Sequence, residues 1–252
     1  VTPELAAKAA ELTRAARSDP EKVQAIYNYV TGLRYLAVEL GVNSFRPHAA
    51  ANVLRNQFGD CKDKANLFNT LLRSQNIEAR LVLVPRFAQA HESVPGLAFN
   101  HAISRVTLGN ETIWVDTTDD VCRFGMLPPG DAGRKVLVID GKSSALTSLP
   151  PPTVNEHQLK VRAQVSCPDA AGAAWPITME VTTLGYPDYE LRAAAREMKR
   201  STVPVLTAKF QPTAGVFELE QQSFTPVSAL SENFAWSAEG KCVGLLSAAG
   251  GK

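Results

Sequence analysis

Three residues that lie far apart in the sequence, Cys61, His101 and Asp116, are of the types that together activate a thiol nucleophile. Cys61 follows Asp60, a good N-cap residue, so we expect the thiol in the first turn of a helix. There the unpaired N–H groups and the positive end of the helix dipole stabilise a thiolate. An imidazole can then act as a base, and a carboxylate can orient the imidazole. These residue types predict acyl transfer by a thiol, provided that the fold brings the three side chains together.

A predicted β-hairpin places His101 and Asp116 on one face of a sheet. Gly109–Asn110 is typical of a two-residue turn between two apolar runs. With that turn, His101 lies opposite Thr118 and shares a face with Asp116, which is two residues earlier. Diagonal neighbours on one face are ~7–8 Å apart, within reach of a carboxylate and an imidazole. The prediction depends on the register, because an odd turn without a bulge would reverse the faces.

The elements that must position these residues are helices in the first part of the chain and strands after them. Cys61, Ala65, Phe68 and Leu72 recur at helical spacing, which places the cysteine on the inward, apolar face of its helix. The expected helices are 2–17, 19–32, 48–54 and 61–75, and the expected strands are 77–84, 99–108, 111–118 and 135–140. This order predicts an α+β domain with helices packed on one side of an antiparallel sheet.

A proline-rich segment divides the chain. Three successive prolines, 150–152, stiffen the backbone and cannot donate ladder hydrogen bonds, so we expect a domain boundary there. Residues 1–150 would form the core with the three candidate residues, and residues 151–252 a smaller β-rich accessory domain. The second domain is expected to hold strands at 157–166, 176–184 and 216–222 and one helix at 188–199.

The composition excludes several classes of partner. The chain has 252 residues, of which 45% are hydrophobic and 20% charged, so it can bury a substantial core. Its formal net charge of +1 and the lack of a long basic run argue against a nucleic-acid partner. We expect no membrane-spanning segment. Because the first residue is Val1, we expect a processed or excised fragment, and further domains in a longer parent chain.

No metal or cofactor is expected. The other three histidines are not spaced as zinc ligands relative to one another or to any cysteine. An acidic cluster, Asp116, Asp119 and Asp120, could attract calcium, but it lacks the spacing of an EF-hand. The remaining cysteines form no CxxC pair. Two of them could form one disulfide, but the sequence does not assign the pairing. These remaining cysteines are Cys122, Cys167 and Cys242.

The segments around the candidate residues resemble the bacterial transglutaminase-like superfamily. The segments that carry the resemblance are Arg34–Gly41, Phe45–Pro47, Phe58–Ala65 (FGDCKDKA), Phe99–Ile103, Trp114–Thr118 and Gly125–Pro128. They follow the family's order between about residues 20 and 140, with Thr117 where the family usually has proline. The chain after the prolines is similar to the β-rich domain that follows this core in multidomain members.

The resemblance implies a papain-like core with a defined role for each residue. Cys61 would be the nucleophile, His101 the general base and acid, and Asp116 the residue that holds the imidazole. Tyr35 is a candidate for a second oxyanion donor beside the backbone N–H of Cys61. The implied reaction is acyl transfer on peptide or protein amides through a thioester, which ends in hydrolysis or transamidation. The resemblance also suggests a periplasmic or secreted protein.

Two other functions stay open. A catalytically silent binding or scaffold module could retain the same fold. An arylamine-acetyltransferase-like enzyme would use the same three residue types. That enzyme is disfavoured, because Asn56–Asp60 precedes the cysteine where an arginine- and glycine-rich segment would be expected.

Overall fold

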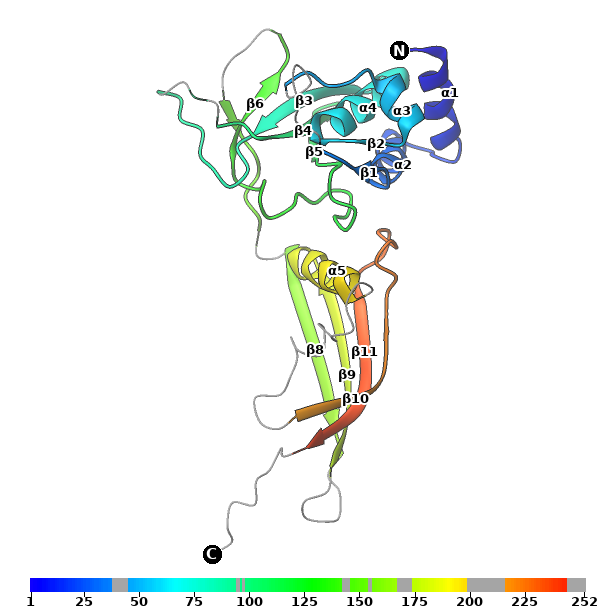
Figure 1. Ribbon diagram of the computed structural model, residues 1–252, viewed down its shortest axis with the longest axis vertical. Helices are drawn as coiled ribbons and strands as arrows, with labels where there is room; N and C mark the ends of the chain where they lie inside the picture. The colour runs from blue at the N-terminus through cyan, green and yellow to red at the C-terminus, as the bar shows by residue number, and fades with distance from the viewer. Residues whose placement is uncertain are drawn as a thin grey trace, which may run out of the picture. The chain divides into compact units, whose positions relative to one another are not determined.

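The chain forms two compact units, Val1–Pro152 and Thr153–Lys252, and the proline segment lies where they meet in sequence (Figure 1). The computed structural model describes residues 1–37, 45–93, 96, 98–141, 146–153, 156–166, 174–198 and 216–243. Parts of three predictions lie outside these residues: Val38–Gly41 of the family-like segments, Cys167, and the end of the last predicted helix at Lys199.

Four helices form one layer of the first unit. Thr2, Ser18 and Asp60 cap three of them, each side-chain oxygen accepting a hydrogen bond from the backbone N–H three residues later. The first helix is shorter than predicted, because after Thr13 the backbone N–H groups of Arg14 and Ala16 bond to carbonyls three residues earlier, and the chain turns. The helices are α1 (Pro3–Leu12), α2 (Asp19–Thr31), α3 (Ala50–Asn56) and α4 (Cys61–Ser74).

The sheet of the first unit has the strand order β5-β4-β3-β6-β7, and every neighbouring pair is antiparallel. Its strands are β3 (Glu78–Val84), β4 (His101–Leu108), β5 (Glu111–Val115), β6 (Lys135–Ile139) and β7 (Leu146–Ser148). The predicted hairpin register is confirmed, since Leu108 pairs with Glu111. β5 ends earlier than predicted because the carboxylate of Asp116 accepts hydrogen bonds from the N–H and hydroxyl of Thr118, which turns the chain out of the ladder.

The central helix α4 packs between the other helices and one face of the sheet. Phe68, Leu71 and Leu72 are completely buried there, in a core that includes Ala79 of β3 and Val106 of β4. A separate apolar core covers the opposite face of the sheet and contains no helical residue: Val82, Val84, Ile103, Leu127, Val136, Val138 and Leu149. The helices therefore cover one side of an antiparallel sheet, and the predicted α+β class is confirmed.

The second unit is a four-stranded antiparallel sheet with one helix. Its strand order is β10-β11-β9-β8. The elements are β8 (Gln158–Val165), β9 (Trp175–Leu184), α5 (Tyr186–Met198), β10 (Val216–Phe224) and β11 (Ala235–Val243). β11 was not predicted from the sequence, because its inward-facing positions include Ala238 and Gly240 rather than large apolar residues. A Cβ at Gly240 would lie 2.2 Å from the carbonyl oxygen of Glu218, so the close approach of β10 requires glycine there.

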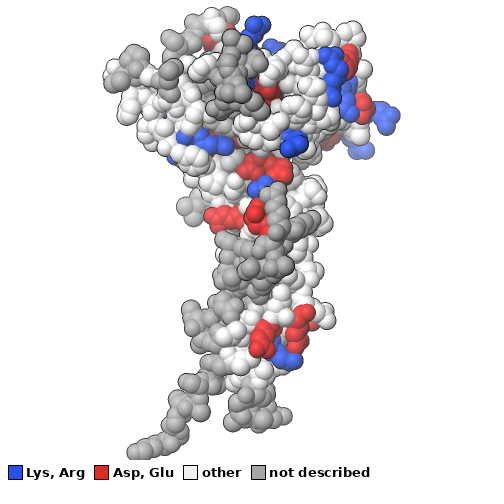
Figure 2. Space-filling view, in the orientation of Figure 1, with Lys and Arg blue, Asp and Glu red and all other residues white. Residues whose placement is uncertain are grey.

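The charged surface of the described residues is mixed in sign. On the face drawn in Figure 2, basic and acidic side chains lie in a few small groups among uncharged ones. Among the described ranges, no helix combines the length and apolar character needed to cross a bilayer.

Candidate active site

Cys61 opens the central helix and is partly exposed to solvent. The residue before it, Asp60, accepts a hydrogen bond from the N–H of Asp63 at 3.1 Å and so fixes the first turn. Gly59 precedes the cap, and a Cβ at this position would lie 2.7 Å from the Cβ of Asp63. The glycine therefore lets the incoming chain lie against the start of the helix, where the thiol sits beside unpaired N–H groups.

The polar side chains in the first turns of α4 anchor the helix. Asp63 accepts a hydrogen bond from the backbone N–H of His48 at 2.8 Å, and its carboxylate lies 2.9 Å from the imidazole Nδ1 of that residue. Lys62 pairs with Asp60. The contacts of Asp63 tie the start of the helix to the chain at His48, and Asp60 balances the charge of Lys62 beside the thiol.

Lys64 lies in the first turn of α4 and is completely buried. Its ammonium donates hydrogen bonds to the carbonyls of Thr31 at 3.1 Å and Leu33 at 2.9 Å, which fixes the end of α2 against α4. Burial lowers the pKa of Lys64 to about 8, although the carboxylates of Asp116 and Asp120 oppose the shift. This lysine therefore serves mainly to hold two helices together.

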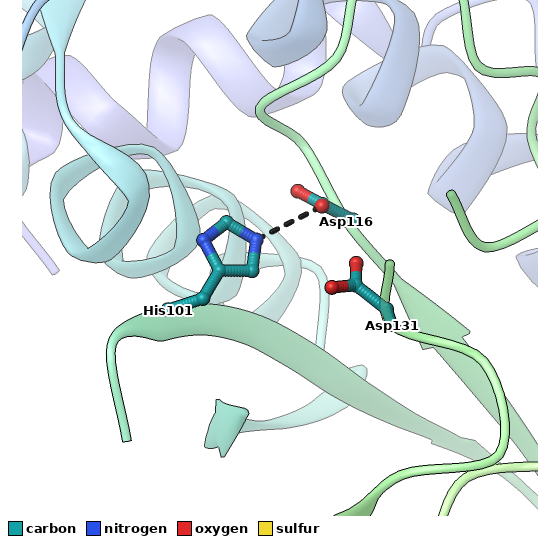
Figure 3. A group of neighbouring side chains, drawn as sticks. All are labelled: His101, Asp116 and Asp131. Carbon is teal, nitrogen blue, oxygen red and sulfur yellow. Dashed lines mark hydrogen bonds and ion pairs between the residues drawn. The ribbon is translucent and has the colours of Figure 1, made fainter. Parts of the chain in front are cut away.

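His101 and Asp116 form a buried pair. The imidazole Nε2 lies 2.9 Å from Oδ2 of Asp116 (Figure 3). The other oxygen, Oδ1, accepts hydrogen bonds from the N–H of Thr118 at 2.8 Å and from its hydroxyl at 2.7 Å. The two residues come from the first position of β4 and the position just after β5, so the confirmed register brings them together as predicted.

The charge state of His101 follows from its neighbours. Burial favours the neutral ring, but hydrogen bonds to Asp116 and Cys61 and the charge of Asp116 raise the pKa of His101 to about 9, against an opposing effect of Arg86. Because Nε2 is bound to Asp116, Nδ1 is the ring nitrogen left for the thiol. His101 is thus bonded to Asp116, and Cys61 lies near enough to affect the pKa of the imidazole.

Sequence reasoning missed two residues of this group, Arg86 and Asp131. Arg86 follows β3, and its Nη2 lies 2.5 Å from Oδ2 of Asp116. The same guanidinium bonds Asp131 through two atoms, Nε to Oδ1 and Nη2 to Oδ2, both at 2.7 Å. No motif marks either residue. Physical chemistry alone gave a reason to expect a further partner, because a buried carboxylate needs a cation or a hydrogen-bond donor for each of its oxygens.

The pKa values of the two carboxylates are shifted in opposite directions. Burial alone would raise the pKa of Asp116, but the hydrogen bond and charge of His101, with the charge of Arg86, hold it well below its usual range. Burial and the nearby charge of Asp116 raise the pKa of Asp131 to about 6, although Arg86 opposes this. Asp116 is therefore the ionised partner of His101 near neutral pH.

The ligand atoms of His101, Asp116 and Asp131 all lie within 4.8 Å of one another, a spacing that would suit a metal ion (Figure 3). Arg86, however, bonds both carboxylates, and its guanidinium supplies the positive charge that a metal would bring. The arrangement is better described as a charge network than as a metal site.

Tyr35 lies beside the start of α4. β1 (Arg34–Tyr35) runs parallel to β2 (Phe58–Gly59), and Tyr35 pairs with Gly59. This short pairing was not predicted. Burial and the neighbouring Cys61 and Asp60 raise the pKa of Tyr35 to about 12, so the phenol keeps its proton and can donate a hydrogen bond near the thiol.

Comparison with known proteins gives one family match, which falls within the first unit. A family model described as the transglutaminase-like superfamily matches residues 6–118, a range that contains Cys61, His101 and Asp116. No curated protein is significantly similar in sequence.

Two solved structures are similar in part. A structure titled "a Putative Cysteine Protease from Cytophaga hutchinsonii" is 21% identical over 46% of this chain and 37% of its own, with a TM-score of 0.37. A "putative protease" from Parabacteroides distasonis ATCC 8503 is 12% identical over 95% of this chain and 49% of its own, with a TM-score of 0.47. The chain thus spans less than half of either protein.

Proposed function

Because residues 6–118 match the model of the transglutaminase-like superfamily, we propose that this chain is a cysteine-dependent enzyme acting on peptide or protein amides. One observation carries the proposal: a buried His101–Asp116 pair adjoins Cys61 at the N-terminus of the central helix. Nucleophile, base and orienting carboxylate are the parts that thiol-dependent acyl transfer requires.

In the proposed reaction, the thiolate of Cys61 attacks the amide carbonyl and forms a C–S bond. Backbone N–H groups at the start of α4 and the hydroxyl of Tyr35 hold the oxyanion. The imidazolium of His101 then gives its proton to the leaving amine as the C–N bond breaks, which leaves a thioester. Asp116 keeps the ring in place throughout.

The second half of the reaction depends on the acceptor. His101, now neutral, takes a proton from the attacking group, and sulfur leaves as the thiolate when the thioester C–S bond breaks, which restores the starting thiolate and imidazolium. Water as the acceptor gives hydrolysis, as in a peptidase or amidase. An amine gives transamidation.

The pH dependence of Cys61 alkylation tests this proposal. The protein and His101→Ala are treated with iodoacetamide across a pH series, and the modified cysteines are located by peptide mass spectrometry. We expect Cys61 to react rapidly well below pH about 8, where an ordinary thiol is protonated, and to lose this reactivity without His101. Cys122, which is completely buried, should stay unmodified and reports in the same digest that the protein is folded.

An ordinary thiol profile, unchanged by His101→Ala, would contradict the activated pair and favour a binding or scaffold module of the same fold. A positive result justifies assays of peptide-amide hydrolysis and of amine incorporation, which separate the two acceptors.

A further inference from the structure

We propose that Arg86 and Asp131 act together as a positioning pair, which holds the Asp116 carboxylate ionised and oriented against His101. The inference rests on the proposed function, because it assigns these two residues to the same reaction. Neither would touch the substrate, and both would act through Asp116.

The first argument is geometric. Oδ2 of Asp116 accepts hydrogen bonds from both His101 and Arg86, while Oδ1 accepts two from Thr118. The carboxylate is completely buried, so no solvent competes for these contacts. Asp131 fixes Arg86 by a two-pronged contact, which sets the direction of the guanidinium as well as its position. The orientation of Asp116 is thus fixed from both sides.

The second argument is the charge balance around the imidazole. Asp116, Cys61 and Arg86 have the largest effects on the pKa of His101, and a carboxylate oxygen of Asp131 also lies within 4.8 Å of a ring nitrogen. Arg86 alone would disfavour an imidazolium, because it brings a second cation to the oxygen that His101 binds. Asp131 compensates that cation, and its side chain, like that of Asp116, is completely buried. One guanidinium between two carboxylates leaves one net negative charge for the imidazolium.

The third argument is topological. Arg86 follows β3, Asp116 follows β5, and Asp131 lies in the chain between β5 and β6. Three separate segments therefore meet at one carboxylate. Because β3 lies between β4 and β6 in the sheet, Arg86 can bridge the side that carries His101 and the side that carries Asp131.

The charge-compensation argument gives predictions of opposite sign. The midpoint of the His101 titration is measured by NMR of the ring Cε1–Hε1 group, assigned with His101→Ala. Asp131→Asn leaves Arg86 uncompensated, so the midpoint should fall by about one pH unit. Arg86→Gln removes the cation, so the midpoint should stay at or above its original value. The double variant, R86Q with D131N, removes both charges and should return the midpoint toward that of the unaltered protein.

Glu78→Gln is the matched control. It removes one negative charge from an exposed ion pair on β3, and it should not move the midpoint. The other three histidines report in the same spectra whether a variant stays folded. Equal falls of the midpoint in Asp131→Asn and Arg86→Gln, or no change in either, would overturn the proposal.

These measurements stand apart from the test of function. If the midpoints move as expected but Cys61 shows an ordinary thiol profile, the positioning of Asp116 stands and the proposed enzyme activity falls. If Cys61 is activated and the midpoints do not move, the activity stands and the Arg86–Asp131 assignment falls. Should Asp131→Asn not fold, Arg86→Gln decides by itself: a midpoint at or above that of the unaltered protein supports the proposal, and a fall overturns it.

Discussion

At the scale of single residues, the charge of His101 is the property of the site that depends most directly on pH. Its ring is only 7% exposed, yet its neighbours raise its pKa to about 9. The cost of burying the cation is offset by the ionised carboxylate of Asp116, which is itself held by Thr118 and Arg86. A buried imidazolium is therefore a stable state of the folded protein near neutral pH.

This pKa predicts how stability changes with pH. The folded-state value lies above the unfolded value of about 6.5, so the folded protein binds the proton more tightly. The stabilisation is fully present below pH about 6.5 and is lost as pH rises through about 9, with an upper value on the order of 3 kcal/mol. Hydrogen exchange of the α4 amides, corrected for intrinsic rates, measures it.

His101→Gln is the comparison for that experiment, because it cannot titrate. The variant should show a flatter dependence of α4 protection between pH about 6.5 and about 9. Parallel losses in both proteins would show that other groups control stability in this range.

At the scale of elements, the start of α4 determines where the thiol lies. The helix begins at Cys61 because the side chain of Asp60 satisfies an N–H of the first turn. Gly59 permits the close approach of the preceding chain, and Lys64 joins the helix to the end of α2. The thiol therefore sits on a rigid, capped terminus.

We predict that Asp60→Ala lowers stability by about 1 kcal/mol and slows the alkylation of Cys61, because the first turn loses its cap. Ser18→Ala is the matched control, since Ser18 caps α2 by the same kind of bond. It should cost about 1 kcal/mol for the lost cap and leave the alkylation rate unchanged, whereas Asp60→Ala also leaves Lys62 without its partner. Equal slowing in both variants would mean that the rate follows overall stability rather than the geometry of the α4 terminus.

At the scale of the whole molecule, each unit contains its own arginine–aspartate ion pair, whose carboxylate is buried. In the second unit, the completely buried guanidinium of Arg192 bonds Asp188 at 2.7 Å. It also donates to three backbone carbonyls, those of Pro226, Val227 and Glu232. Asp188 in turn accepts a hydrogen bond from the N–H of Phe234, so this pair connects α5 to the segment before β11.

We predict that Arg192→Met destabilises the second unit by about 3–5 kcal/mol, because it leaves the carboxylate of Asp188 buried without its cation. Limited proteolysis with peptide mapping should show new cleavage within residues 156–243 and none in the first unit. The alkylation profile of Cys61 should not change. A parallel loss of Cys61 reactivity would show that the second unit supports the site.

The sequence by itself determined the features that depend on short-range patterns. The cap at Asp60 and the apolar repeat after it predicted α4, and the Gly109–Asn110 turn predicted the register that joins His101 to Asp116. The prolines marked the place where the chain divides into two units. Caps, turns and periodicity act over a few residues, so they can be read without the fold.

Only the tertiary structure decided which charges meet in the interior. Arg86 and Asp131 are 45 residues apart in the sequence and show no motif, yet they surround Asp116. The pairing of Tyr35 with Gly59 and the close contact at Gly240 likewise depend on distant segments. The physical reason is that a buried charge must be compensated by whatever group the fold brings within a few ångströms, and sequence separation does not limit that choice.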